Sequence, residues 1–220
     1  MSQFQFQTVG NIISGLGSII ELKNLLNDFK PKRVLMVTDP GMLVHQLHLP
    51  IVEILETLQQ DYIIYSNVQA DPPEHLVLDA VKFAQHEKID FVLGFGGGSS
   101  LDVAKIIAVL AHPDQQQRIQ DLYGVGHAKR PRLPLILVPT TAGTGSEVTP
   151  ISIVTTGETT KTGIVSPVLY ADVAILDANF TQNLPPSITA ATGIDAMVHA
   201  IEAYTSKVKK NPYVDIDRKS

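Results

Sequence analysis

Cysteine is absent from the 220 residues of this chain, and so is tryptophan. Without thiols the chain has neither disulfides nor thiolate metal ligands, which leaves histidine, aspartate and glutamate as candidate ligands for a transition metal. Long apolar runs are lacking as well, because no stretch approaches the roughly 20 residues that a membrane span requires. Residues 1–7 have neither the basic start nor the apolar centre of a signal peptide. We therefore expect a cytoplasmic protein that does not bind membranes.

Positive charge is also scarce. The 17 lysine and arginine residues are outnumbered by 22 aspartate and glutamate residues, and the net charge of −5 offers no electrostatic footprint for nucleic acid. Hydrophobic residues make up 44% of the chain and charged residues 18%, which is typical of a globular protein and argues against disorder. The length fits a single α/β domain with a small appendage.

Apolar strands alternate with amphipathic helices through most of the chain. The expected strands are residues 33–39, 62–65, 90–93 and 135–138, followed by shorter ones at 151–155, 163–166 and 173–176. Helical patterns lie between the first four, at about 50–60, 76–84 and 101–110. This order predicts an α/β fold with a doubly wound parallel sheet of the Rossmann type.

The two ends of the chain depart from this pattern. Residues 3–9 alternate between polar and apolar, which predicts an exposed strand or hairpin arm at the edge of the fold. Near residue 180 the pattern changes from sheet to helix, and two helices are expected at about 186–192 and 194–206. We therefore divide the chain into an α/β domain over residues 1–180 and a helical segment over residues 181–220.

A glycine-rich turn follows the third strand of the predicted sheet. The consecutive glycines at 96–98 would let the backbone approach a pyrophosphate, while the next helix points its free N–H groups at it. The usual dinucleotide fingerprint is not met, because Ser99 stands where its last glycine is required, and no Walker lysine follows. The alternative is a tight turn in which Ser99 is the helix N-cap and Asp102 completes a capping box.

Polar residues also follow two other strands. The loop at 140–146 lies at the carboxyl end of the fourth strand, where open α/β sheets bind ligands. Its hydroxyls would suit phosphate or ribose, although a surface loop of turn-forming residues has the same composition. Asp39 ends the first apolar strand and could accept hydrogen bonds from an adenosine ribose, which would favour NAD over NADP. It could equally start the turn at Pro40 and Gly41.

The last predicted helix carries a candidate metal site. Asp195 and His199 are four residues apart, so they share one face and could ligate a single divalent cation. An intrahelical salt bridge explains the same spacing. Histidine and carboxylate ligands without sulfur suit Fe(II), Zn or Mn. Two ligands do not complete a catalytic metal site.

Three segments together resemble the iron-containing, group III alcohol dehydrogenases. They are Gly96-Gly97-Gly98-Ser99-x-x-Asp102-x-Ala104-Lys105, Pro139-Thr140-Thr141-Ala142-Gly143-Thr144-Gly145-Ser146-Glu147 and Ala191-Thr192-Gly193-Ile194-Asp195-Ala196-x-x-His199-Ala200-Ile201-Glu202. The resemblance runs from about residue 5 to 214. It implies an N-terminal dinucleotide-binding domain with the dehydroquinate synthase-like fold, a C-terminal all-helical domain, and a metal in the cleft between them. It also implies NAD-dependent hydride transfer between a small alcohol and its aldehyde or ketone.

The resemblance implies a role for eleven residues, divided by the group that each would hold. They are Asp39 for the adenosine ribose; Gly97, Gly98 and Ser99 for the pyrophosphate; Thr140, Thr141 and Thr144 for the phosphate and nicotinamide side; Asp102 beside the cofactor; Lys161 for the cofactor ribose; and Asp195 and His199 for the metal. Iron(II) is the metal that the family implies. The dehydroquinate synthases and glycerol dehydrogenases share the fold, but their metal motifs fit the Asp195 and His199 spacing less well.

One departure from the family concerns the metal ligands. The family places two more histidine ligands well downstream of these positions, whereas six of the seven histidines here precede His199 and the chain ends at Ser220. We therefore expect a shortened product that is inactive as this chain and exposes an apolar face over 194–206, buried by self-association or a partner. The alternatives are an NAD-binding remnant without catalysis and an oligomerising fragment.

Overall fold

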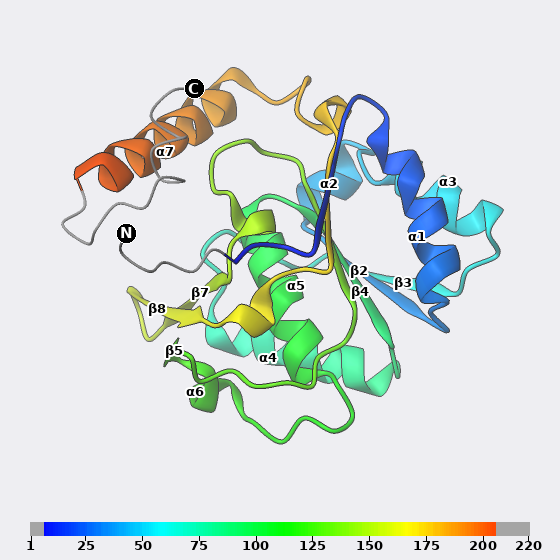
Figure 1. The fold of residues 1–220 in the computed structure, drawn as a ribbon, viewed down its shortest axis with the longest axis horizontal. Helices are drawn as coiled ribbons and strands as arrows, with labels where there is room; N and C mark the ends of the chain where they lie inside the picture. Colours follow the sequence, from blue (N-terminus) through cyan, green and yellow to red (C-terminus); the bar gives the residue numbers. More distant parts are fainter. Residues whose placement is uncertain (1–6, 206–220) are drawn as a thin grey trace, which may run out of the picture.

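A six-stranded parallel sheet is the centre of the computed structural model, which describes residues 7–205 (Figure 1). Its strand order is β1-β9-β6-β4-β2-β3, and every neighbouring pair is parallel. The strands are β1 (Asn11–Ser14), β2 (Val34–Val37), β3 (Tyr62–Tyr65), β4 (Phe91–Gly96), β6 (Leu135–Pro139) and β9 (Val173–Leu176). This arrangement confirms the predicted doubly wound α/β sheet.

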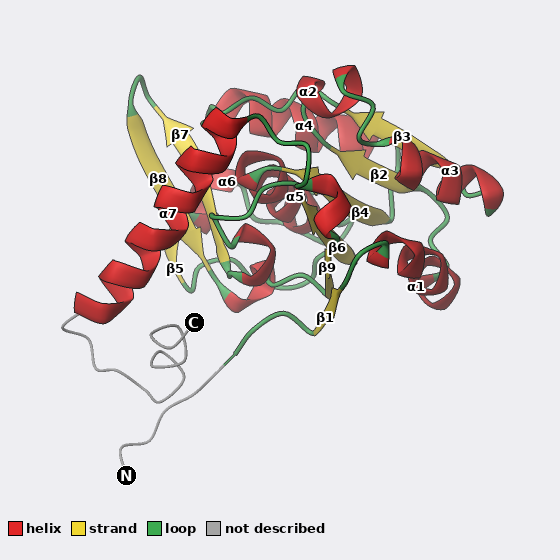
Figure 2. Ribbon diagram, turned by 90° about the horizontal axis from the view of Figure 1, so that it is seen from above, coloured by secondary structure: helices red, strands yellow, loops and turns green. Residues whose placement is uncertain are grey.

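Helices cover both faces of this sheet (Figure 2). On one face lie α1 (Leu22–Phe29) and α3 (Leu49–Thr57), and on the other α4 (Glu74–His86) and α5 (Gly98–Leu110). Side chains of β2 alternate between the two cores, with Met36 packed on the α1 side and Leu35 on the α5 side. Burial on both faces explains why these strands are continuous apolar runs in the sequence.

A smaller sheet lies beside the main one. Strands β7 (Ile151–Thr156) and β8 (Thr160–Val165) form an antiparallel hairpin, and β5 (Gly124–Val125) pairs with β8. The sequence patterns predicted the hairpin strands but not β5 or the helix before it, α6 (Ile119–Leu122). The remaining short elements are α2 (Pro40–Val44), η1 (Ser18–Glu21), η2 (Ser146–Val148), η3 (Pro167–Leu169) and η4 (Ala178–Phe180).

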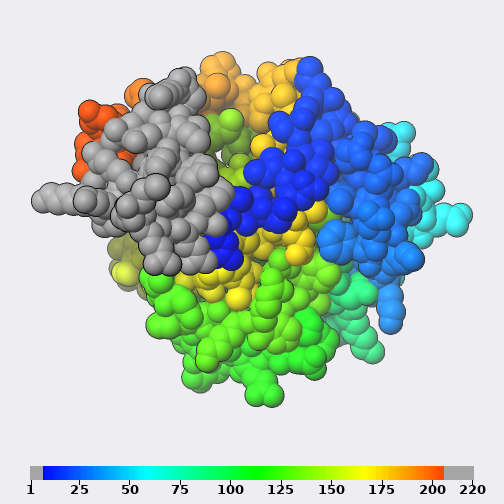
Figure 3. Space-filling model, viewed as in Figure 1, coloured from blue at the N-terminus to red at the C-terminus, as the bar shows by residue number. Residues whose placement is uncertain are grey.

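The strand or hairpin arm predicted at residues 3–9 is described only from residue 7 onward, and the edge strand that the structure shows begins at Asn11. The strand is β1, which pairs with β9 through Asn11–Ser14, whereas residues 7–9 are not in a strand and residues 1–6 lie outside the described part. In the space-filling view the blue N-terminal segment lies against the yellow to orange segment that contains β9 (Figure 3). Alternation predicted an exposed strand, but the residues that reach β9 decide where the ladder forms.

The C-terminal part of the described chain is one helix, α7 (Pro186–Thr205), and not the two that were predicted. Gly193 does not interrupt it, because a glycine inside a helix costs only about 1 kcal/mol relative to alanine. The helix lies apart from those that cover the sheet (Figures 1 and 2), and none of its residues is buried. Over residues 7–205, no helix has both the length and the apolar character needed to cross a bilayer.

Candidate cofactor and metal site

The direction of chain progression reverses between β2 and β4. From β2 the chain moves outward to β3, and from β4 it moves the other way through β6 to β9. Ligands of open α/β sheets bind beyond the carboxyl ends of the strands at such a point. Asp39 comes two residues after β2, and Gly97 comes directly after β4. The fold therefore brings these two predicted site residues together.

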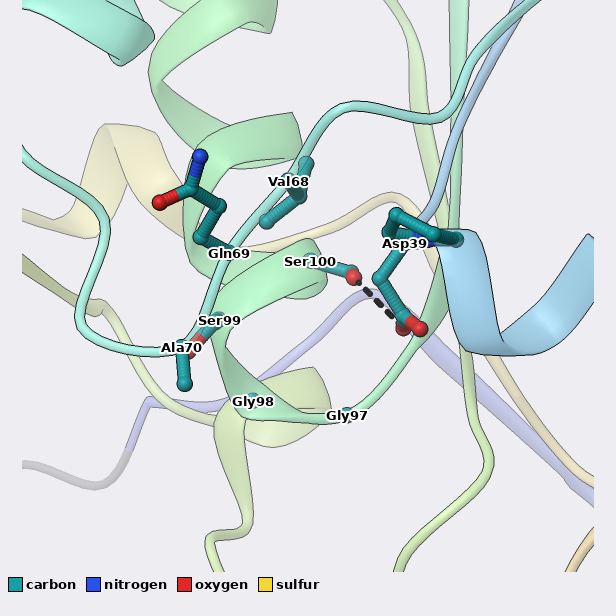
Figure 4. Close-up of a pocket in the computed structure, with 9 residues that line it drawn as sticks. Asp39, Val68, Gln69, Ala70, Gly97, Gly98, Ser99 and Ser100 are labelled. Atoms are coloured by element: carbon teal, nitrogen blue, oxygen red, sulfur yellow. Dashed lines mark hydrogen bonds between the residues drawn. The ribbon is translucent and has the colours of Figure 1, made fainter.

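A cavity of about 450 Å³ opens between Asp39, the loop at residues 68–70 and the turn at residues 97–100 (Figure 4). Asp39 is the N-cap of α2, because its Oδ1 accepts the N–H groups of Gly41 at 2.9 Å and Met42 at 3.3 Å. Its Oδ2 accepts the Ser100 hydroxyl at 3.3 Å. A carboxylate has about four acceptor sites, so Asp39 can cap the helix and still accept a hydroxyl from a ligand.

The glycine-rich turn leads into α5 earlier than the capping-box alternative requires. Gly97 is the N-cap, without a side-chain cap, and Ser99 already lies in the first helical turn. The interpretation of Ser99 as N-cap was therefore wrong. Gly96 makes the early turn with a φ of 142°, a conformation that favours glycine. The first N–H groups of α5 lack intrahelical partners, and the residues that carry them, Gly98, Ser99 and Ser100, line the cavity, as the phosphate interpretation requires.

A larger cavity, of about 670 Å³, lies on the other side of the same turn. It shares Gly98 and Ser99 with the first, so the two cavities adjoin along this turn and together form the candidate cleft. The predicted site residues that also line it are Asp102, Thr144, Lys161, Asp195 and His199. The two polar loops meet here, because a Cβ built on Gly98 would lie 3.0 Å from the Thr144 side chain.

The other two predicted threonines line neither cavity. Thr140 is completely buried, and its hydroxyl has no hydrogen-bond partner among the residues that the structure describes. Thr141 lies close to the turn, with its side chain 3.8 Å from the position of a Cβ on Gly97. Their contacts with a phosphate therefore remain a prediction.

Asp102 lies in the wall of the larger cavity, where its side chain is 14% exposed. Its carboxylate accepts the Ile153 N–H at 2.9 Å, the Lys105 ammonium at 3.3 Å and the Ser146 hydroxyl. These bonds connect α5 to β7 and η2. They also show that Asp102 does not fold back to cap its own helix.

Lys105 is completely buried behind this wall. Its ammonium also donates to Ser146 Oγ at 2.9 Å and to the Ile151 carbonyl at 2.6 Å. Burial lowers the pKa of Lys105, while the negative charges of Asp102 and Glu147 oppose that shift. No role was predicted for Lys105 or Ser146. The available signal was a lysine inside the apolar run of a buried helix.

Lys161 reaches the larger cavity from β8. Its ammonium pairs with the Asp71 carboxylate at 2.6 Å, and 56% and 66% of the two side chains are exposed. The Thr155 hydroxyl donates to the Asp71 carbonyl at 3.0 Å, and the Thr155 N–H donates to the Pro72 carbonyl at 2.9 Å. These contacts join the hairpin to the loop that precedes α4, at the border of the cleft.

The predicted metal ligands face the same cavity from α7. His199 Nε2 and Asp195 Oδ1 are 3.6 Å apart, and the side chains are 52% and 43% exposed. This geometry fits both an ion pair and two ligands of one cation. Within residues 7–205, no group of three or more candidate ligand side chains lies close enough to hold a metal.

Gly143 sets the distance between α7 and the loop after β6. A Cβ at this position would overlap the Thr192 carbonyl oxygen and lie 2.8 Å from the Thr192 Cβ. Only glycine allows this approach without movement of one backbone. The contact lies three residues before Asp195, so it determines where the candidate ligands lie relative to the cleft.

Comparison of the chain with known proteins identifies its family. The family described as iron-containing alcohol dehydrogenase matches residues 10–178. This chain belongs to that family. Sulfoacetaldehyde reductase from Bilophila wadsworthia is 39% identical over 202 residues, 91% of this chain and 52% of the relative. Long-chain-alcohol dehydrogenase 1 from Geobacillus thermodenitrificans is 42% identical over 202 residues, 91% of this chain and 51% of the relative.

A solved structure supports the same assignment. NADH-dependent butanol dehydrogenase A from Thermotoga maritima superposes with a TM-score of 0.88 at 28% identity, over 100% of this chain and 55% of that one. This chain spans about half the length of the curated relatives it matches. The predicted family of oxidoreductases and the predicted Rossmann-like fold are thus confirmed.

Proposed function

We propose that this chain supplies the dinucleotide-binding domain of an NAD-dependent, metal-dependent alcohol dehydrogenase, which transfers hydride between a small alcohol and its aldehyde or ketone. The observation that carries this proposal is the pair of cavities that adjoin along the turn at Gly98 and Ser99. Asp39 lies on one side of that turn, and the pair of Asp195 and His199 on the other. The choice of NAD is supported by the Thermotoga maritima relative, which is called NADH-dependent.

In this proposal each region of the cleft would bind one part of the cofactor. The free N–H groups at the start of α5 would bind the pyrophosphate, and Asp39 would bind the adenosine ribose. The nicotinamide would then lie in the larger cavity, which Lys161 and Thr144 line. When bound, NAD supplies a hydride acceptor and a divalent metal supplies positive charge at the alcohol oxygen. Fe(II), Zn and Mn all suit the carboxylate and imidazole of Asp195 and His199.

The domain boundary near residue 180 is part of this proposal. The main sheet ends at Leu176, and α7 lies apart from it with both candidate ligands. Three apolar side chains of α7 are more than half exposed, namely Ile194, Met197 and Ile201. We propose that α7 begins a helical metal-binding part and that a second copy or a partner covers this apolar surface.

A second candidate function is NAD binding without catalysis. This function is favoured by the small number of candidate metal ligands. Among the described residues, α7 provides only the pair Asp195 and His199 at the larger cavity. A catalytic metal site typically has three protein ligands, whereas cofactor binding requires only the cleft. Cofactor titration tests the part that the two functions share, and activity assays separate them.

Discrimination between NADH and NADPH tests the role of Asp39. We expect the chain to bind NADH at least about tenfold more tightly than NADPH, because the Asp39 carboxylate would repel the 2′-phosphate. Asp39→Asn should bring the two affinities to within about threefold while it keeps the α2 cap, since asparagine caps helices as well as aspartate. Calorimetric titration with both cofactors measures this. Equal binding of both cofactors by the unmodified chain would mean that Asp39 is only a helix cap.

Metal content tests the Asp195 and His199 pair. Two ligands from one helix leave most of the coordination shell to water, so we expect the dialysed chain to hold far less than one metal per molecule. Mass spectrometry of the dialysed protein for iron, zinc and manganese measures it. His86→Ala, at an exposed histidine of α4, is the matched control for His199→Ala. Stoichiometric metal that only His199→Ala removes would show that another copy contributes ligands.

A further inference from the structure

A buried positive charge lies behind the wall of the larger cavity. Lys105 has no exposed surface, and its three ammonium protons reach Asp102 Oδ1, Ser146 Oγ and the Ile151 carbonyl. A buried ammonium is costly unless it is paired and fully hydrogen-bonded, as it is here. Asp102, Ser146 and Ile151 all line the cavity, whereas Lys105 does not. Lys105 therefore contacts one wall of the proposed cofactor site from behind.

Asp102 has acceptor capacity left on its cavity side. An ionised carboxylate has about four acceptor sites. Three are used, by Lys105 and Ser146 on Oδ1 and by the Ile153 N–H on Oδ2. The exposed 14% of the side chain borders the cavity, so one further donor can reach it from there. The carboxamide of a nicotinamide ring carries such a donor.

We infer that Lys105 is a positioning residue, whose ammonium holds the Asp102 carboxylate in place to accept a hydrogen bond from the nicotinamide end of the cofactor. The inference rests on the proposed function, which places that end in the larger cavity. Ser146 and the Ile153 N–H fix Asp102 from η2 and β7, but neither carries charge. The ammonium is the charged one of the three partners, and a hydrogen bond between two charged groups is stronger than one from a neutral donor.

The charges around Lys105 are consistent with this role. Asp102 from its own helix and Glu147 from η2 both raise the pKa of Lys105, against the effect of burial. Burial in turn raises the pKa of Glu147, and the Lys105 charge opposes that shift. Removal of the ammonium would therefore leave two partly buried carboxylates without a cation between them.

Two ligands that differ only in the nicotinamide ring separate positioning from general structural support. NADH and ADP-ribose share the adenosine, pyrophosphate and second ribose, but ADP-ribose has no nicotinamide. The full chain, Lys105→Met and the control Lys82→Met are titrated with both ligands by calorimetry, and their folding is compared by circular dichroism. Lys82 lies in the neighbouring α4, is exposed and pairs only with Asp79 in the salt bridges of the described residues. Lys105→Met keeps most of the side-chain volume while it removes the charge.

We expect Lys105→Met to weaken NADH binding about tenfold or more, the loss typical of a hydrogen bond to a charged group, and to leave ADP-ribose within about twofold. Lys82→Met should change neither. Equal weakening of both ligands, or of neither, would overturn the inference. Failure of the unmodified chain to bind either ligand would instead overturn the proposed function.

A double variant covers the case in which Lys105→Met does not fold. Lys105→Met with Asp102→Asn removes both charges together, and replacement of a buried ion pair as a unit is tolerated far better than removal of one partner. We expect the double variant to fold, to bind ADP-ribose normally and to bind NADH about tenfold more weakly. NADH affinity equal to that of the unmodified chain would show that Lys105 and Asp102 do not serve the nicotinamide end.

Discussion

Alcohol oxidation by the 220-residue chain is expected to stay at background, with NAD and a short primary alcohol or diol as substrates and with Fe(II) added. Two ligands on one helix cannot hold a cation and an alcohol oxygen to the accuracy that hydride transfer requires, and misplacement by about 1 Å costs roughly a hundredfold in rate. Water at the exposed Asp195 and His199 side chains also competes for the metal. The measurement is NADH formation followed by absorbance.

A matched pair of variants makes this expectation decisive. Turnover in the usual enzymatic range of roughly 1 to 1,000 per second, abolished by His199→Ala and unaffected by His86→Ala, would contradict it. That result would mean that assembly of several copies completes the metal site. Size-exclusion chromatography of the same sample would then show an oligomer, and dilution below its dissociation constant would remove the activity.

Gly97→Val is expected to weaken NADH binding by about a hundredfold, which corresponds to roughly 2.7 kcal/mol. The side chain would stand in the cleft at the place where the backbone must approach the pyrophosphate. The protein itself has room for it, because only the Thr141 side chain, at 3.8 Å, lies within 4 Å of a Cβ at this position. Gly97 has a φ of −74°, which valine also adopts.

Thermal unfolding of the same variant separates a binding defect from a folding defect. We expect its melting temperature to fall by only a few degrees, because valine is a poorer N-cap than glycine. Gly15→Val is the control, because nothing lies within 4 Å of a Cβ at Gly15 and this residue lines neither cavity. Unchanged NADH affinity in Gly97→Val would show that the pyrophosphate does not bind at this turn. The proposed function would then lose its main support.

The main sheet was predictable because its strands are buried on both faces. Such strands leave continuous apolar runs in the sequence, and β3, β6 and β9 were predicted to within one residue. The short β5 has only two residues and no run of its own, so it left no pattern to find. Residues 124–125 form a strand because they pair with β8, which is distant in the sequence. The same reason explains why β1 was not predicted at Asn11–Ser14, since its position depends on pairing with β9.

The candidate site was predictable where its residues act through the backbone. Glycines at a strand end indicate a turn and a close approach, so Gly97 and Gly98 could be read from the sequence alone. The roles of Lys105 and Ser146 could not, because their contacts join residues 41 and 46 positions apart in the chain. Asp102 was selected through the family resemblance, but its three partners became visible only in the folded structure.

The contact between Gly143 and Thr192 links the position of the proposed nicotinamide cavity to the position of the candidate metal ligands. An alcohol dehydrogenase must control these two positions together. The loop that contains Gly143 also carries Thr144, which lines the proposed nicotinamide cavity, and Thr192 lies just before Asp195. Hydride donor and hydride acceptor would therefore be aligned by one backbone contact and not by two independent supports. A larger side chain at position 143 would push α7 away from the loop and lengthen the path of the hydride, even if the cofactor still bound with its normal affinity.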